Sequence, residues 1–223
     1  MLKKEIALQP RSMKQSHIPD PAIVFDFGGV LLDWNPRYLY RRFFDGDPTA
    51  TERFLTEIGF YAWNDQQDKG RPLDLGTAEL SRQFPHYADL IKAYYDRWEE
   101  SLAGPIQPTV DILYSLKQVG HCLYALSNWS AETFRRVRHK YAFLDWFEAI
   151  VLSGEVKLIK PDPQIFLVFL EQIGRMAEEC LLIDDSAANV AAARQLGFDT
   201  IRFESPGQLR QELCQRGLLA PDS

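Results

Sequence analysis

The sequence contains few cysteines, and none of them are arranged in pairs. Only three occur in 223 residues, and no two form a Cys-x-x-Cys motif. An odd number at wide spacing excludes a disulfide framework and a structural zinc site. Cys122 and Cys180 lie in apolar runs, so we expect both to be small buried hydrophobic side chains rather than catalytic thiols.

Long apolar runs and an excess of basic residues are also missing. No run approaches the roughly 20 apolar residues that span a membrane. Residues 1–20 carry four basic side chains but no hydrophobic stretch, unlike a secretory signal. With 25 Lys and Arg against 31 Asp and Glu, the formal net charge is −6, which removes the electrostatic basis for non-specific nucleic-acid binding. We expect a cytoplasmic protein with a loose tail over residues 1–20 and neither membrane nor nucleic-acid partners.

Five short apolar runs predict the strands of a parallel β-sheet. They lack the alternation of a half-exposed strand, and helical patterns separate them, which is typical of a sheet covered on both faces. Asp162 and Pro163, for example, place a capping carboxylate and a first-turn proline at the start of one helical pattern. The predicted fold class is therefore α/β, with a doubly wound, Rossmann-like parallel sheet. The five predicted strands are 22–25, 121–126, 149–152, 180–183 and 200–203.

The stretch of about eighty residues between the first predicted strand and Thr109 shows no convincing strand pattern. Loops of this length are uncommon inside a compact domain, so we expect a folded helical insertion. We predict an α/β core over 21–35 and 106–223 and a four-helix cap over 36–105. The helical patterns lie near 38–44, 51–59, 77–84 and 88–101, and the least helical stretches are 63–65 and 69–72.

Polar residues follow four of the predicted strands, at the edge where open α/β sheets bind ligands. Parallel strands bring their carboxyl ends together, so we expect these residues to lie close to one another. In chain order they are Asp26 with Gly28 and Gly29, then Ser127 with Asn128, then Lys160, and finally Asp184 with Asp185.

This combination of groups suits phosphoryl transfer. An acidic cluster is costly unless a cation compensates it, and Mg²⁺ prefers hard oxygen ligands. Asp26 can attack phosphorus and form an aspartyl-phosphate, while Lys160 offsets charge and Ser127 donates a hydrogen bond. Gly28 and Gly29 leave room for backbone amides to approach the phosphate. The sequence therefore predicts Mg²⁺-dependent hydrolysis of a small phosphorylated metabolite.

Four motifs resemble those of the haloacid dehalogenase-like hydrolases, in the branch with a helical cap after the first strand. The resemblance spans about residues 22–203. It implies that Asp26 is the nucleophile, that Asp185 together with Asp184 binds Mg²⁺, and that the carbonyl of Gly28 is a further metal ligand. It also implies that Ser127 and Lys160 bind phosphate, and we include the neighbouring Asn128 in that group. The motifs are VFDFGGVL at 24–31, LSN at 126–128, IKPDPQIF at 159–166 and IDDS at 183–186.

One position departs from the family pattern. Phosphatases of this family usually carry a second aspartate two residues after the nucleophile, where this chain has Gly28. That aspartate protonates the leaving group, and a general acid typically contributes about 10²–10⁴-fold. The chain is similar to a subset with glycine here that includes a glucose-1-phosphate phosphatase, whose anomeric leaving group depends less on an acid. A water molecule, Asp33 or Asp65 are the other candidate replacements.

Two further functions stay open at this point. The first is hydrolytic dehalogenation of a 2-haloacid, in which aspartate attacks carbon without a metal. The acidic pair Asp184–Asp185 argues against it, because uncompensated carboxylates would repel both nucleophile and substrate. The second is a catalytically impaired protein that binds a phosphorylated ligand, since the usual acid is absent at Gly28.

The proposed cap contributes one further site candidate. We expect the cap to close over the substrate and exclude water. Arg71 either reaches the substrate's phosphate or hydroxyls when the cap closes or pairs with a neighbouring acid such as Asp68 or Asp74. Trp34 and Trp129 follow the first two motifs and either wall the cleft or belong to the core.

Overall fold

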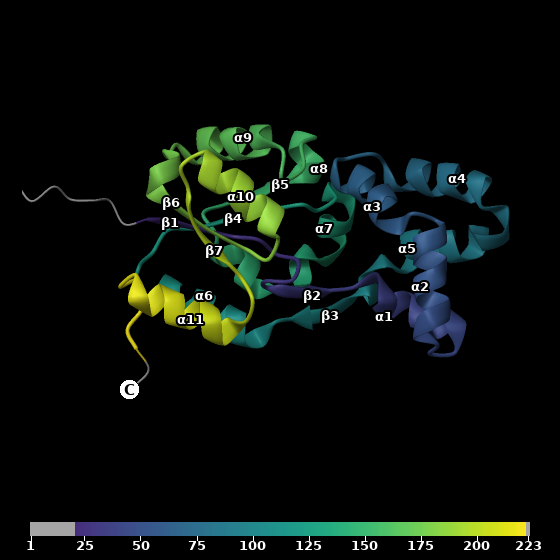
Figure 1. Ribbon diagram of the computed structural model, residues 1–223, viewed down its shortest axis with the longest axis horizontal. Helices are drawn as coiled ribbons and strands as arrows, with labels where there is room; N and C mark the ends of the chain where they lie inside the picture. The colour runs from purple at the N-terminus through teal and green to yellow at the C-terminus, as the bar shows by residue number, and fades with distance from the viewer. Residues whose placement is uncertain (1–20, 222–223) are drawn as a thin grey trace, which may run out of the picture.

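A five-stranded parallel sheet lies at the centre of the computed structural model, which describes residues 21–221 (Figure 1). The α/β fold predicted from the sequence is confirmed, and the strand bounds differ from the predicted ones by at most two residues. The expected N-terminal tail lies outside the described residues. In spatial order the strands are β5 (Ala149–Leu152), β4 (Leu123–Ser127), β1 (Ala22–Phe25), β6 (Cys180–Asp184) and β7 (Asp199–Arg202).

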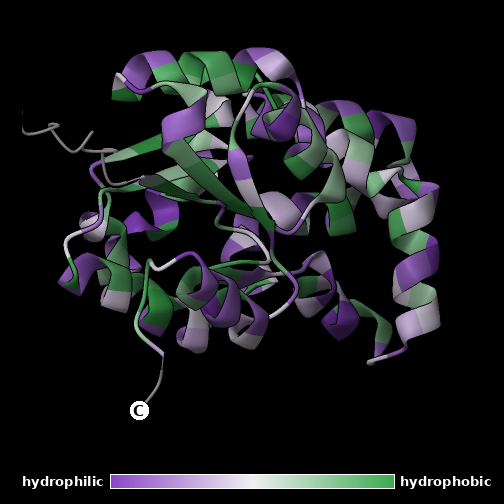
Figure 2. Ribbon diagram, turned by 60° about the vertical axis from the view of Figure 1, so that its left-hand side comes forward, coloured by the Kyte–Doolittle hydropathy of each residue, from purple (hydrophilic) through white to green (hydrophobic). Residues whose placement is uncertain are grey.

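Helices cover both faces of the sheet because its strands are apolar on both sides. Alternate residues of β1 enter different cores: Ile23 and Phe25 pack on one face, Ala22 and Val24 on the other. Figure 1 shows one pair of helices above the sheet and one below, and Figure 2 shows the strands mostly in the hydrophobic colour. The first face is covered by α6 (Gln107–Gln118) and α11 (Pro206–Gln215), the second by α9 (Pro163–Ile173) and α10 (Ala187–Gln195).

Helix caps fix the loops that follow the strands. Asp162 caps α9 by accepting a hydrogen bond from the amide of Gln164 at 2.9 Å, which confirms the predicted cap. Ser130 caps the short helix α7 (Ala131–Val137) through the amide of Glu132 at 3.3 Å. These caps set where the chain turns after β4 and before α9. A further short helix, α8 (Ser153–Val156), directly follows β5.

A two-stranded antiparallel ribbon connects the core to the helical insertion. It pairs β2 (Leu32–Trp34) with β3 (Leu102–Pro105), so the expectation of no strand in this region is wrong. Both strands are too short for a periodic pattern, and Gly104 and Pro105 in the second are poor strand formers. The ribbon brings the two ends of the insertion together beside the carboxyl edge of the sheet (Figure 1).

The insertion contains five α-helices where four were predicted. Residues 63–65, predicted to be among its least helical parts, lie inside α3, where Trp63, Asn64 and Gln67 are buried. With Phe60, the helix has four buried residues, and two of them are polar, which weakens the periodicity that an apolar stripe would have shown. The helices are α1 (Pro36–Tyr40), α2 (Pro48–Glu57), α3 (Phe60–Asp68), α4 (Leu73–Gln83) and α5 (Ala88–Arg97), with 3₁₀ turns at Arg41–Phe44, Pro85–Tyr87 and Trp98–Ser101.

Aromatic side chains join the insertion to the sheet. The ring of Trp129, which follows β4, lies 5.7 Å from that of Trp98 in the insertion and 5.8 Å from that of Phe27 in the core. All three are buried in one continuous cluster. Such contacts fix how the insertion sits against the ends of the strands. Within residues 21–221, no helix has both the length and the apolar character needed to cross a membrane.

Packing against the sheet predicts that alanine substitutions at two neighbouring residues of α9 differ greatly in their effect on the free energy of unfolding. Phe166 is 0% exposed and Leu167 is 44% exposed. Phe166→Ala should lower the free energy of unfolding by about 3–5 kcal/mol, because it leaves a cavity under the sheet. Leu167→Ala should change it by no more than about 0.5 kcal/mol. Chemical denaturation of both variants checks this, and similar losses for the two would contradict the packing described.

Candidate active site

A single buried lysine joins the ends of three strands. The Nζ atom of Lys160 lies 3.0 Å from Oδ2 of Asp26 and 2.6 Å from Oδ2 of Asp184. It also donates to the carbonyl of Leu126 at 2.8 Å. An ammonium group has three donors, and all three are used here. The predicted meeting of these groups at one edge of the sheet is thus what the structure shows.

The side chain of Asn128 holds Lys160 in place by hydrogen bonds to the lysine's backbone. The side-chain oxygen of Asn128 accepts from the amide of Lys160 at 2.8 Å, and its NH₂ group donates to the carbonyl of Lys160 at 2.9 Å. Both ends of the Asn128 amide are therefore occupied, and direct phosphate binding by this side chain stays a prediction. The nearby Lys157 donates to the carbonyls of Gly70 and Gly154, both at 3.0 Å.

Burial gives Asp26 an unusual proton affinity. Desolvation, together with the charges of Asp184 and Asp185, raises the pKa of Asp26 to about 7, although Lys160 opposes this shift. Burial by itself would lower the pKa of Lys160, but Asp184 and Asp26 outweigh that effect and raise it. Three carboxylates and one ammonium leave two uncompensated negative charges when all are ionised. A divalent cation would balance them and favour the ionised Asp26 that nucleophilic attack requires.

The donor set fits Mg²⁺. One oxygen from each of Asp26, Asp184 and Asp185 lies within 4.8 Å of the others, and carboxylate oxygens are the ligands that Mg²⁺ prefers. The two neighbouring acids differ in their surroundings. Asp184 is buried, and its oxygens accept from Lys160, from the amide of Ser186 at 2.9 Å and from Asn189 at 3.0 and 3.1 Å. Asp185 is exposed, so its carboxylate is the more accessible of the two.

Gly29 allows Asp185 to approach the loop after β1. A Cβ atom at position 29 would lie 2.5 Å from Oδ2 of Asp185, and the φ of +73° is one that side-chain-bearing residues rarely adopt. The amide of Gly29 donates to the carbonyl of Leu32 at 2.9 Å. A glycine is therefore needed here so that Asp185 can lie against this loop. Contact of Gly29 with phosphate stays a prediction.

A cavity separates the strand ends from the insertion. Gly28, Ser127 and Asn128 line it from the core, and Asn64 and Asp68 line it from α3. Trp34 and Trp129 belong to its wall, and they also pack in or against the hydrophobic core, so both of their predicted interpretations apply. The cavity thus combines polar groups at the sheet edge with a largely apolar enclosure. The remaining lining residues are Leu32, Tyr94, Trp98 and Leu102.

Asp68 lines this cavity, although the sequence analysis considered it only as a partner of Arg71. Its Oδ1 accepts from the amide of Ser130 at 3.0 Å and its Oδ2 from Asn64 at 2.7 Å. Burial, aided by the charges of Asp65 and Asp26, raises the pKa of Asp68 to about 8. The spacing of four between Asn64 and Asp68 is the signal that could have found it, because it puts both on one helix face.

Arg71 lies outside this cavity. Its guanidinium donates to Gln67 at 2.6 Å and pairs with Glu79 at 2.8 Å, so its acidic partner is neither Asp68 nor Asp74. It lines a second, more polar hollow between the insertion and the core. Contact of Arg71 with a substrate stays a prediction.

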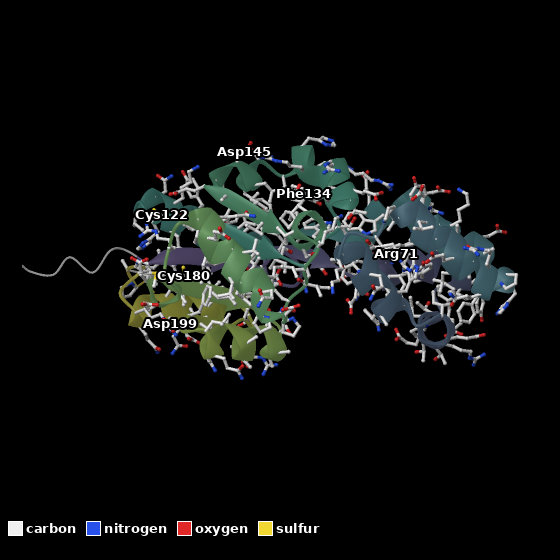
Figure 3. All side chains as sticks on the ribbon, turned by 90° about the horizontal axis from the view of Figure 1, so that it is seen from above. Arg71, Cys122, Phe134, Asp145, Cys180 and Asp199 are labelled. Atoms are coloured by element: carbon white, nitrogen blue, oxygen red, sulfur yellow. The ribbon has the colours of Figure 1, made fainter. Side chains whose placement is uncertain are left out.

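The cysteines have no part in the site. Figure 3 shows Cys122 and Cys180 at the end of the core away from the insertion that carries Arg71. All three cysteines are free, Cys180 is buried as expected, and Cys122 is half-buried.

The parallel sheet, the helical insertion after its first strand and the lysine–carboxylate cluster define an α/β protein with its candidate active site at the carboxyl edge of the sheet. The sequence model of the haloacid dehalogenase-like hydrolases matches residues 21–197. The chain belongs to this enzyme family.

Relatives of known activity include phosphatases. D-ribitol-5-phosphate phosphatase of Bacteroides thetaiotaomicron is 32% identical over 204 residues, which cover 86% of this chain and 95% of that protein. Sesquiterpene phosphatase of Aspergillus oryzae is 29% identical over 180 residues, covering 79% and 86%. A crystal structure of a family enzyme from B. thetaiotaomicron with magnesium and inorganic phosphate matches with a TM-score of 0.63 at 26% identity, covering 83% of this chain and 95% of that one.

Substituting Lys160 tests whether its ammonium group stabilises the buried carboxylates. Lys160→Met leaves Asp26 and Asp184 buried without their partner, which should lower the free energy of unfolding by about 3–5 kcal/mol in metal-free buffer. The loss should shrink as the pH falls from about 8 to about 5, because protonation removes the uncompensated charges. Exposed Lys157→Met is the control, expected to cost less than about 1 kcal/mol. A pH-independent loss in Lys160→Met would contradict this account.

Metal binding can be measured without activity. At 100 times its dissociation constant, Mg²⁺ should stabilise the protein by about 2.7 kcal/mol, seen as a higher melting temperature. Asp185→Asn should remove most of this gain, since Asp185 supplies the accessible carboxylate of the cluster. Exposed Asp89→Asn should leave the gain intact. An equal Mg²⁺ response in Asp185→Asn and wild type would rule out the proposed ligand set.

Proposed function

We propose that the protein is a Mg²⁺-dependent phosphatase of small phosphorylated metabolites, acting through an aspartyl-phosphate on Asp26. The observation that carries this proposal is the Lys160 ammonium shared between Asp26 and Asp184, beside the accessible carboxylate of Asp185. The phosphatase activity of the relatives supports it.

Each core residue has a proposed task in the reaction. Asp26 attacks phosphorus with a carboxylate oxygen, and Lys160, 3.0 Å from that carboxylate, lowers the pKa that burial raises and so favours its ionised form. Ser127, buried at the end of β4 and lining the cavity, donates a hydrogen bond to a phosphoryl oxygen. Bound Mg²⁺, held by Asp26, Asp185 and the carbonyl of Gly28 with Asp184 nearby, would compensate the negative charge of the phosphoryl group.

The residues that line the cavity indicate which classes of substrate fit it. Its indole and phenol rings offer flat apolar surfaces, which suit the carbon-bearing face of a sugar as well as a hydrocarbon chain. A sugar phosphate is our first candidate, in line with the ribitol phosphate relative. The apolar lining from Trp34, Tyr94, Trp98 and Trp129 favours one second candidate, the phosphate ester of an apolar alcohol, and one relative acts on a sesquiterpene.

The decisive experiment is a panel of phosphate esters with Mg²⁺, comparing wild type with Asp26→Asn. We expect phosphate release from at least one sugar or apolar-alcohol phosphate, and a loss of at least about 10³-fold in Asp26→Asn because the nucleophile is gone. EDTA should abolish release in wild type. Asp89→Asn, an exposed acid on α5, serves as the matched control and should keep full activity.

Two outcomes would overturn the proposal, one with a 2-haloacid as the substrate and one with the panel of phosphate esters. Chloride release from a 2-haloacid in EDTA would establish dehalogenation, the alternative that needs no metal. Tight binding of phosphate esters with no turnover above Asp26→Asn would establish a ligand-binding protein.

A further inference from the structure

The family's usual general acid is absent from this chain, and its position is open. A Cβ atom at Gly28 would meet no atom within 4 Å, and this glycine has no positive φ. Neither space nor backbone conformation therefore requires glycine here. A phosphatase acting on an ordinary alcohol ester still needs a proton for the leaving oxygen, so another group must provide it.

We propose that Asp68, the last residue of α3, is the general acid–base of this enzyme and replaces the carboxylate missing at Gly28. The inference rests on the proposed phosphatase function and goes one step further. It assigns the proton transfer to the insertion, whereas the nucleophile comes from the core.

Position favours Asp68 over the other acids near the site. Asp68 lines the same cavity as Gly28 and Ser127, and it lies close enough to Asp26 to feel its charge. Asp33 is turned to Tyr38, whose hydroxyl donates to both its oxygens at 2.9 Å. Asp65 is exposed, and neither it nor Asp33 lines the cavity.

Two hydrogen bonds hold the Asp68 carboxyl in place without using up its proton. One oxygen accepts from the amide of Ser130 and the other from Asn64, so either oxygen can still carry a proton toward a ligand. Asn64 is itself held by the hydroxyl of Tyr94 at 2.8 Å. The charged groups that face Asp68 are Asp65 on its own helix and Asp26 after β1, and both favour its protonated form.

The backbone of Asp68 ties this acid to the core. Ser153, at the start of α8, donates its hydroxyl to the Asp68 carbonyl at 2.5 Å. Together with the amide of Ser130, this bond anchors the end of α3 on two core elements. The acid is therefore delivered to the cavity only when α3 is docked on the core, which couples proton transfer to closure over the substrate.

The proton balance of the two steps is complete. An oxygen of Asp26 forms a bond to phosphorus while the bond from phosphorus to the alcohol oxygen breaks, and Asp68 gives its proton to that oxygen. The alcohol leaves, and Asp68 is now a carboxylate. Water then attacks phosphorus and gives its proton to Asp68, the bond from phosphorus to Asp26 breaks, and inorganic phosphate leaves.

The test compares two aromatic esters that differ in leaving group. Benzyl phosphate releases a basic alkoxide that needs a proton, whereas 4-nitrophenyl phosphate releases a stable phenolate that does not. In Asp68→Asn, kcat/KM for benzyl phosphate should fall about 10²–10³-fold, within the range of general-acid effects. For 4-nitrophenyl phosphate it should fall less than about tenfold. Asp89→Asn, an exposed acid on α5, should leave both values unchanged.

A second variant guards against a merely structural effect. Gly28→Asp places a carboxylate at the open position, and in the Asp68→Asn background it should restore benzyl phosphate turnover at least about tenfold. Equal losses for the two esters in Asp68→Asn, or no loss for benzyl phosphate, would overturn the inference. Wild type that hydrolyses 4-nitrophenyl phosphate but not benzyl phosphate would also overturn it. If neither ester is turned over above Asp26→Asn, it is the phosphatase function itself that fails.

Discussion

The site depends on one ammonium group. Lys160 donates to Asp26, Asp184 and the carbonyl of Leu126, and so connects residues at the ends of β1, β6 and β4. A buried lysine is tolerable only when its partners compensate its charge, and buried carboxylates need a cation in the same way. These ion pairs hold Asp26, the proposed nucleophile, at a fixed place at the edge of the sheet. They also leave an excess of negative charge that a divalent cation balances.

The helical insertion supplies apolar surface that the polar edge of the sheet lacks. The core provides carboxylates, a lysine and a hydroxyl, all of them polar, while aromatic rings from both parts enclose the space above them. The ring contacts of Trp129 with Trp98 and Phe27 fix the distance between the two parts. Asp68 then reaches the cavity from the insertion. In the proposed reaction, the insertion therefore supplies the proton and contacts the substrate, while the core binds the phosphate.

How far the sequence predicts this protein depends on the range of the interactions involved. The strands of the sheet follow from continuous apolar runs, and Asp26, Lys160 and Asp184 follow from their places at strand ends. The ribbon of β2 and β3 escaped prediction because three or four residues carry no period. The proposed role of Asp68 escaped because the carboxyl meets the loop before α7 only when α3 docks on the core. The two bonds from the side chain of Asn128 to the backbone of Lys160 escaped for the same reason, because they join residues that are 32 positions apart.

The central claim is that Asp26 becomes covalently phosphorylated during turnover. Acid quenching in the steady state, followed by borohydride reduction of the acyl phosphate and peptide mass spectrometry, reads this out directly. The account predicts conversion of Asp26 to homoserine in the peptide that spans residues 15–37, dependent on Mg²⁺ and on substrate. Turnover without any reduced residue, or reduction at a different aspartate, would contradict it.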